Sequence, residues 1–176
     1  YSGYLADSGA WTGKFSTFDP QQFWVQYTFN NTIPNVFINL GNLQSRTDNE
    51  VLLAVADILK VAAMHRIADI YGPIPYSKLE SNESVYVEYD SQEAVYTKMF
   101  EELDAVIAAL HANEQMSAEA FRKSDNVYYG DIKKWIKYAN SLKLRMAMRL
   151  SYVKSDIAQK KAEEAVADGV ILDNAD

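Results

Sequence analysis

The chain has 176 residues, 48% of them hydrophobic, with seven glycines and four prolines, so its length and composition indicate one globular domain and exclude a disordered segment. The formal net charge of −7 argues against nucleic acid as a partner, because phosphate binding needs clustered Lys and Arg. The absence of cysteine excludes disulfides, thiolate metal sites and cysteine nucleophiles.

Neither end of the chain carries a recognisable targeting or membrane segment. No stretch approaches the roughly 18 consecutive apolar residues that suggest a membrane span. The N-terminal "YSGYLADSGAW" lacks the basic start and apolar run of a signal peptide. Because the sequence begins without Met and ends abruptly at "ILDNAD", we expect it to be a piece of a longer protein. We expect an irregular N-terminal arm over residues 1–18 and a helical array over residues 19–176.

The first predicted helix begins at Asp19–Pro20, with Asp as the cap and Pro at the first position. It places Phe23 and Tyr27 on one face. Pro34 is expected to end this helix or to begin the next. A short helix over Asn35–Arg46, followed by a loop, is expected after it.

A strong amphipathic helix is predicted over Asp48–Tyr71, because its apolar residues recur at spacings of three and four. Its stripe consists of Leu52, Val55, Leu59, Ala62, Arg66 and Ile70, widened by Val51, Ile58, Ala63 and Ile67. Gly72 can adopt the left-handed conformation that closes helices, and Pro73 cannot continue the helix. Pro75 keeps the following chain extended, so "YGPIPY" is predicted to be a rigid helix stop.

The next helix is predicted over Asp90–Leu110, with Asp90 and Glu93 forming a capping box at its start. Its apolar stripe consists of Val95, Met99, Leu103, Val106 and Leu110. Just before it, Val85–Tyr89 comes closest to the alternation of a strand, and it is short enough to be a brief extended piece.

Two further helices are predicted over Asp131–Tyr152 and Ser155–Asp168. The stripe of the first consists of Ile132, Trp135, Ala139, Leu142, Met146 and Arg149, and the small-residue face of the second consists of Ala162, Ala165 and Val166. Gly169 is expected to end the second helix. A succession of helices with short connections predicts an all-α array of helical hairpins.

No metal or cofactor site is expected. His65 and His111 lie far apart without metal-ligand spacing, and His65 sits beside an apolar face, where a packing role is favoured. The carboxylates Glu101, Glu102 and Asp104 are expected on a solvated face, where a catalytic pKa shift is unfavourable. Neither a Gly-rich phosphate loop nor a Gly-x-Ser-x-Gly elbow is present, so we do not expect an enzyme.

Arg145 and Arg149 lie four residues apart among Leu, Met and Ala, where they would repel each other mildly on an isolated helix. This arrangement indicates that carboxylates from elsewhere in the fold meet them. A structural ion pair is therefore favoured over a ligand-binding arginine.

Three motifs in order carry a resemblance to a known family. They are "AMHRIADIYGPIPYSKLE", "YVEYDSQEAVYTKMFEELDAVIAAL" and "YYGDIKKWIKYANSLKLRMAMRLS". Together they resemble the SusD/RagB family, in its SusD-like branch. The resemblance includes the Gly-x-x-Pro-Tyr turn at Gly72–Tyr76 and Trp135 followed by the run Ala139–Arg145, and it covers Leu40–Ala175.

The resemblance implies helix pairs packed like tetratricopeptide repeats, followed by a less regular part, so this chain would be the N-terminal helical part of a truncated SusD-like fold. It further implies a non-catalytic surface lipoprotein of the Bacteroidetes outer membrane, with a role in polysaccharide utilisation and nutrient uptake. Such a protein captures glycans or other nutrients and passes them to a SusC-like TonB-dependent barrel. The signal peptide and lipidated cysteine of the family are missing from this sequence, so a membrane contact is expected only through a lipid anchor that this sequence does not contain.

The best candidates for ligand binding lie in the irregular arm, where Tyr4, Trp11, Lys14 and Asp19 combine aromatic and polar side chains. An aromatic ring can stack on the C–H face of a sugar while polar groups bond its hydroxyls. The alternative is that Trp11 packs on the helices as part of the arm.

Two other functions stay open. The first is a helical-repeat scaffold for protein–protein interaction at the cell surface, which the acidic composition and the hairpin layout permit. The second is a helical carbohydrate-active enzyme, which is the weaker reading because no paired carboxylates stand out.

Overall fold

The structure is a computed structural model that describes residues 21–79, 86–116, 121–174 and 176. Its helices, in chain order, are α1 (Gln22–Gln44), α2 (Glu50–Tyr71), α3 (Gln92–Ala112), α4 (Ile132–Arg149) and α5 (Ser155–Asp168). Across the described ranges, extended pairing is limited to one isolated antiparallel bridge, between Ile74 and Asp90. The predicted all-α class is confirmed.

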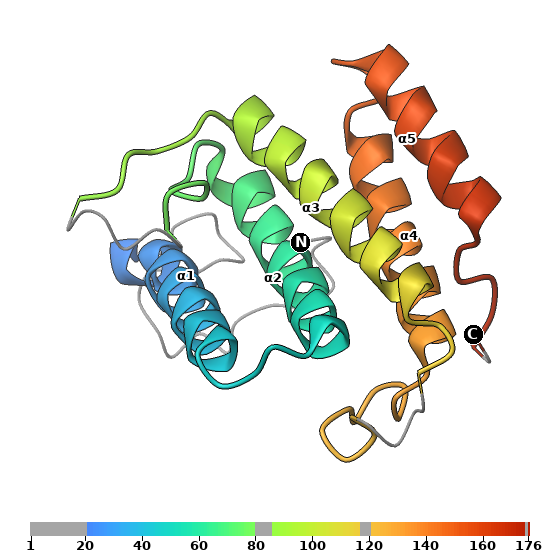
Figure 1. Ribbon diagram of the computed structural model, residues 1–176. Coiled ribbons are helices and arrows are strands. Elements are labelled where there is room, and N and C mark those ends of the chain that lie inside the picture. Colours follow the sequence, from blue (N-terminus) through green and yellow to red (C-terminus); the bar gives the residue numbers. More distant parts are fainter. Residues whose placement is uncertain (1–20, 80–85, 117–120, 175) are drawn as a thin grey trace, which may run out of the picture.

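The helices form an array in which each packs mainly on the next in sequence. Figure 1 shows them side by side in chain order, from α1 at one edge to α5 at the other. The connections from α1 to α2 and from α4 to α5 are short, as in helical hairpins. One apolar core, built mostly from α2, α3 and α4, runs through the array.

α1 is a single helix that passes through Pro34, so the predicted break at this residue is wrong. Ile33 and Leu40, on either side of the proline, are buried and hold both halves of α1 in place. Pro34 itself is exposed, so water can bond the carbonyl that the missing proline N–H leaves without its helical partner. Burial on both sides therefore outweighs the local helix-breaking tendency.

α2 lies between α1 and α3 and also touches α4, so it is buried around most of its circumference. Asn49, rather than Asp48, caps the helix by accepting the backbone N–H groups of Val51 and Leu52 at 3.0 and 3.1 Å. The predicted stripe is wrong at Leu59, Arg66 and Ile70, which are exposed, Leu59 by 49% and Ile70 by 64%. The fully buried positions are Val51, Ile58, Val61, Met64 and Ala68.

The stretch after α2 is the predicted rigid stop. Gly72 has φ +75°, and its N–H donates to the carbonyl of Ala68 at 2.9 Å. Ile74, between the two prolines, and Tyr76, directly after them, are buried in the core. The turn therefore ends α2 and also contributes two side chains to the packing of the array.

Asp90 does not cap α3, so the predicted capping box is wrong. Its carboxylate accepts the backbone N–H groups of Tyr76 and Ser77 at 3.1 and 2.7 Å and the Ser77 hydroxyl at 2.9 Å. Ser91 caps α3 instead, through a hydrogen bond from the N–H of Ala94 at 3.2 Å. Asp90 thereby ties the helix stop after α2 to the start of α3.

Of the three carboxylates expected on a solvated face of α3, Glu102 and Asp104 instead form ion pairs with other helices. Glu102 is partly buried, pairs with Lys60 at 3.2 Å and accepts the Tyr76 hydroxyl. Burial raises the pKa of Glu102, although the hydrogen bond from Tyr76 opposes the shift. Asp104 pairs with Lys143 and Lys161 on α4 and α5, at 2.6 and 2.5 Å.

The start of α4 is organised around Asp125, which is 5% exposed. Its carboxylate accepts the N–H of Gly130 at 2.9 Å, the indole N–H of Trp135 at 2.8 Å, and two further backbone N–H groups from the same loop. Burial alone would raise the pKa of Asp125, but these donors outweigh it and lower the pKa. Trp135 is 2% exposed, which confirms its predicted place in the core.

α5 has the predicted bounds and ends at Gly169, whose φ is +109°. Ala165 is buried as expected, whereas Val166 is 55% exposed, so the small-residue face is shifted toward Ala158 and Ala165. This shift follows from α5 packing on α4 alone along most of its length.

Candidate functional site

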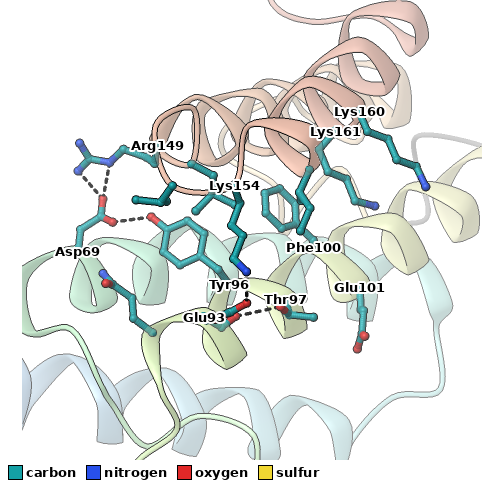
Figure 2. Close-up of a pocket in the computed structure, with 14 residues that line it drawn as sticks. Asp69, Glu93, Tyr96, Thr97, Phe100, Glu101, Arg149, Lys154, Lys160 and Lys161 are labelled. Carbon is teal, nitrogen blue, oxygen red and sulfur yellow. Dashed lines mark hydrogen bonds and ion pairs between the residues drawn. The ribbon is translucent and has the colours of Figure 1, made fainter.

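A groove of about 800 Å³ opens between α3 and the hairpin of α4 and α5. It is formed by the first half of α3, the end of α4 and the start of α5 (Figure 2). Its apolar lining is supplied by Tyr96, Phe100, Leu150, Val153 and Ile157. The groove exists because α3 and α5 both pack on α4 but make little contact with each other.

A cluster of three side chains closes one end of the groove. The Tyr96 hydroxyl donates to one oxygen of Asp69, and the Arg149 Nε donates to the other at 2.8 Å (Figure 2). Burial and the bond to Asp69 raise the pKa of Tyr96. The predicted structural ion pair is thus confirmed for Arg149, whereas Arg145 is exposed and has no ion pair within the described part of the chain.

Cations and carboxylates alternate along the rim of the groove. Lys154 on the α5 side pairs with Glu93 of α3 at 3.0 Å. Lys161 pairs with Asp104, and its ammonium lies 5.9 Å from the centroid of the Phe100 ring. These pairs link α3 to α5 across the groove, so the rim charges are largely neutralised within the chain.

The chemistry of the groove is that of a packing surface. Tyr96 and Phe100 are each 4% exposed, so their ring faces are not available for stacking on a sugar. Asp69 is paired with Arg149 and Glu93 with Lys154, so both carboxylates are occupied by cations of the chain itself. The exposed apolar residues of the groove include Val153 and Ile157, which are 70% and 40% exposed.

The two histidines have different surroundings. His65 is 4% exposed, contacts the carbonyl of Ala62 at 3.0 Å and has its pKa lowered by burial, in line with the expected packing role. His111 lies between Glu114, at 2.5 Å from Nδ1, and Asp168, at 2.9 Å from Nε2. In the described ranges no group of three or more His, Cys, Asp or Glu side chains has a geometry that could hold a metal ion.

The predicted ligand-binding residues Tyr4, Trp11, Lys14 and Asp19 lie outside the described residues. They therefore stay a prediction. The groove residues Tyr96 and Phe100 were not predicted, since they flank the stripe proposed for α3 rather than belonging to it. Their spacing of four, next to that stripe, was the available signal for a second buried face.

No helix in the described ranges is long and apolar enough to cross a membrane. The family model described as "SusD-like: Susd and RagB outer membrane lipoprotein" matches residues 1–176. The chain belongs to this SusD-like family. The resemblance drawn from the three sequence motifs is therefore confirmed.

Solved structures of other SusD-like proteins agree closely in fold. A SusD homologue from Bacteroides thetaiotaomicron is 41% identical with a TM-score of 0.87, over 94% of this chain and 34% of that one. A SusD homologue from Bacteroides uniformis is 38% identical with a TM-score of 0.85, over 97% of this chain and 36% of that one. No curated protein matches the chain.

A third similar structure is described by the ligand that it binds. The chitin-binding SusD homologue from Flavobacterium johnsoniae is 39% identical with a TM-score of 0.75, over 89% of this chain and 33% of that one. The present chain thus spans about a third of the length of each of these three structures.

Proposed function

We propose that this SusD-like chain is the helical part of a non-catalytic subunit that binds oligosaccharides or other nutrients at the cell surface. The observation that carries the proposal is the 39% identity, over 89% of the chain, to a SusD homologue described as chitin-binding. A further matching structure, 34% identical over 90% of this chain, is also described as a chitin-binding protein. Chitin oligosaccharides are therefore the first ligands to try.

The proposed place of the protein in the cell rests on its family. The family description names outer membrane lipoproteins, which supports an anchor in the outer membrane and a surface location. Transfer of the ligand to a SusC-like TonB-dependent barrel is part of the same proposal. Neither the membrane anchor nor the transfer to the barrel assigns a role to the groove between α3 and α5.

The surroundings of the carboxylates support a binding role without catalysis. A glycosidase needs two carboxyl groups that face each other across the scissile bond, one of them with a raised pKa. Asp69 and Glu93 of the groove are paired with cations. Burial raises the pKa of Glu102, but this residue packs between α2 and α3, bonded to Tyr76 and Lys60.

Binding and hydrolysis can be tested together on the full-length protein. We expect binding to at least one oligosaccharide of a panel that includes chitohexaose, measured by calorimetry, with no shortening of the bound sugar after prolonged incubation. Release of shorter sugars would overturn the non-catalytic assignment. Failure to bind any member of a broad glycan and peptide panel would overturn the nutrient-binding proposal.

The groove favours a second candidate function, a protein-interaction scaffold. The lining of the groove is apolar, and the charged residues on its rim pair with one another. Such a surface suits a polypeptide segment better than a sugar, because the aromatic rings of the groove are buried. This function would gain support if the full-length protein bound no small ligand. It is also compatible with glycan binding elsewhere on the molecule.

A further inference from the structure

The helix α1 differs from the rest of the chain in charge. It spans 23 residues, "QFWVQYTFNNTIPNVFINLGNLQ", without a single Asp, Glu, Lys or Arg. Charged residues make up 23% of the whole chain, so a helix of this length would ordinarily carry several. A solvated face of a soluble helix is usually charged, and the missing charge therefore needs an explanation from what α1 contacts.

A ridge on the exposed side of α1 carries aromatic rings and then amides at regular intervals of four residues. The ridge consists of Phe23, Tyr27, Asn31, Asn35 and Asn39, turns about 40° around the helix with each step, and we call it the α1 track. The Phe23 and Tyr27 side chains are 64% and 55% exposed, and their ring centroids lie 5.8 Å apart in an edge-to-face arrangement. All five side chains are exposed, so packing among the described residues does not account for them.

The three asparagines of the α1 track are held in one orientation. The side-chain N–H groups of Asn31, Asn35 and Asn39 each donate to the carbonyl four residues earlier, at 2.8, 2.8 and 2.7 Å. Each amide keeps its side-chain oxygen and its second N–H for an outside partner. Successive amides lie about 6 Å apart along the helix axis, which is comparable to the repeat of one hexose unit in an extended glycan.

A hollow beside the α1 track supplies an apolar contact surface. It has a volume of about 330 Å³, lies between α1 and α2, and has Asn35 and Asn39 among its lining residues. The rest of its lining is mostly aliphatic, including Val36, Leu43 and the half-exposed Leu59. Amides at the edge of an apolar hollow suit a group that is half polar and half apolar, such as a pyranose ring or an acetamido group.

We propose that the α1 track is a binding surface for an uncharged oligosaccharide. The rings of Phe23 and Tyr27 take up the C–H faces of sugar units, and the three amides bond hydroxyl or acetamido groups of the units that follow. The absence of charge along α1 fits a neutral glycan, and Lys60, the cation among the residues that line the hollow, is buried and paired with Asp57 and Glu102. This inference rests on the proposed function and adds to it the site and the charge class of the ligand.

The test uses the full-length protein with Asn31→Ala, Asn35→Ala and Asn39→Ala combined. Alanine is a better helix former than asparagine, so the triple variant keeps α1 folded and a loss of binding reports the amides themselves. The matched control is Gln44→Ala, which removes an exposed amide at the end of the same helix, at least about 140° around it from each of the three asparagines. Circular dichroism melting curves establish that all three proteins are folded.

Calorimetric titration with chitohexaose, and with the neutral glycan that the wild type binds best, gives the result. We expect the triple variant to lose at least about tenfold in affinity and Gln44→Ala to bind like the wild type. Equal affinity of the triple variant and the wild type would overturn the α1 track and leave the proposed function standing. Absence of binding by the wild type would overturn the proposed function, and this inference with it.

Discussion

Trp135 is the residue at which sequence and structure agree most fully, since it is buried and its indole N–H bonds the buried carboxylate of Asp125. We expect Trp135→Ala to lower the free energy of unfolding by roughly 3–5 kcal/mol, because it leaves a cavity and removes a donor from Asp125. Urea denaturation measures the change. Tyr152→Ala serves as the control, since Tyr152 is 100% exposed and its loss should leave the midpoint unchanged. An unchanged midpoint for Trp135→Ala would contradict the core assignment.

Gly72 and Gly41 allow the same substitution to be tested with opposite expected signs. A Cβ added at either position meets no atom within 4 Å, so steric clash plays no part. At Gly72, where φ is +75°, Gly→Ala should cost about 1–3 kcal/mol in backbone strain. At Gly41, inside α1, Gly→Ala should stabilise the protein by about 0.5–1 kcal/mol. If Gly72→Ala raised the free energy of unfolding in chemical denaturation, the backbone of the helix stop would not be strained.

His111 gives the protein a pH dependence of known sign. Both ring nitrogens contact carboxylates, an arrangement that needs the protonated imidazolium, and the bond to Asp168 raises the pKa above 6.5. Its contribution to stability is therefore complete below pH 6.5 and is lost as the pH rises through the raised pKa. The stability difference between wild type and His111→Gln should shrink from pH 6 to pH 9. A constant difference over that range would mean that His111 is not charged in the fold.

At the scale of single elements, local pattern predicted most of the helices but not all of their ends. α3 and α5 were predicted almost to their bounds, because their apolar periodicity and the glycine after α5 are local properties. The break expected at Pro34 did not occur, since burial of Ile33 and Leu40 against the array outweighs one lost hydrogen bond. Sequence periodicity carries no information about such burial on both sides of a proline.

The site was less predictable than the helices because its contacts join distant parts of the chain. Arg149 and Asp69 are 80 residues apart, so the arginine signalled that it needed a carboxylate without showing which one. Glu102 looked like a surface residue because its partners Lys60 and Tyr76 come from α2 and from the turn after it. Only the packing of α2 on α3 brings them together.

The link between α2 and α3 can be tested at Asp90, where a capping box was expected. We expect Asp90→Ala to cost about 1–3 kcal/mol, because it leaves the backbone N–H groups of Tyr76 and Ser77 without their acceptor. Glu93→Ala should cost less than about 1 kcal/mol, since Glu93 contributes an exposed ion pair to Lys154. If the two variants lost equal free energy of unfolding in urea denaturation, the result would favour the capping box between Asp90 and Glu93 instead.

At the scale of the whole molecule, we propose that this chain is one part of a larger binding protein. The solved relatives are about three times as long, with the chain covering 34% and 36% of the first two. A sugar site of useful affinity needs several aromatic and polar contacts that converge on one surface. The α1 track supplies some of them, and the segments outside this sequence are expected to supply the rest.

Glycan binding by the complete protein decides the proposed function. Calorimetric titration of the full-length protein and of residues 1–176 with the same neutral oligosaccharides measures this binding. We predict measurable binding by the full-length protein and affinity at least about tenfold lower for residues 1–176, a loss of about 1.4 kcal/mol or more. Circular dichroism establishes that the shorter chain is folded. Equal, tight binding by both would place the whole site on the helical part. Absence of glycan binding by the full-length protein would contradict the account and favour the scaffold function.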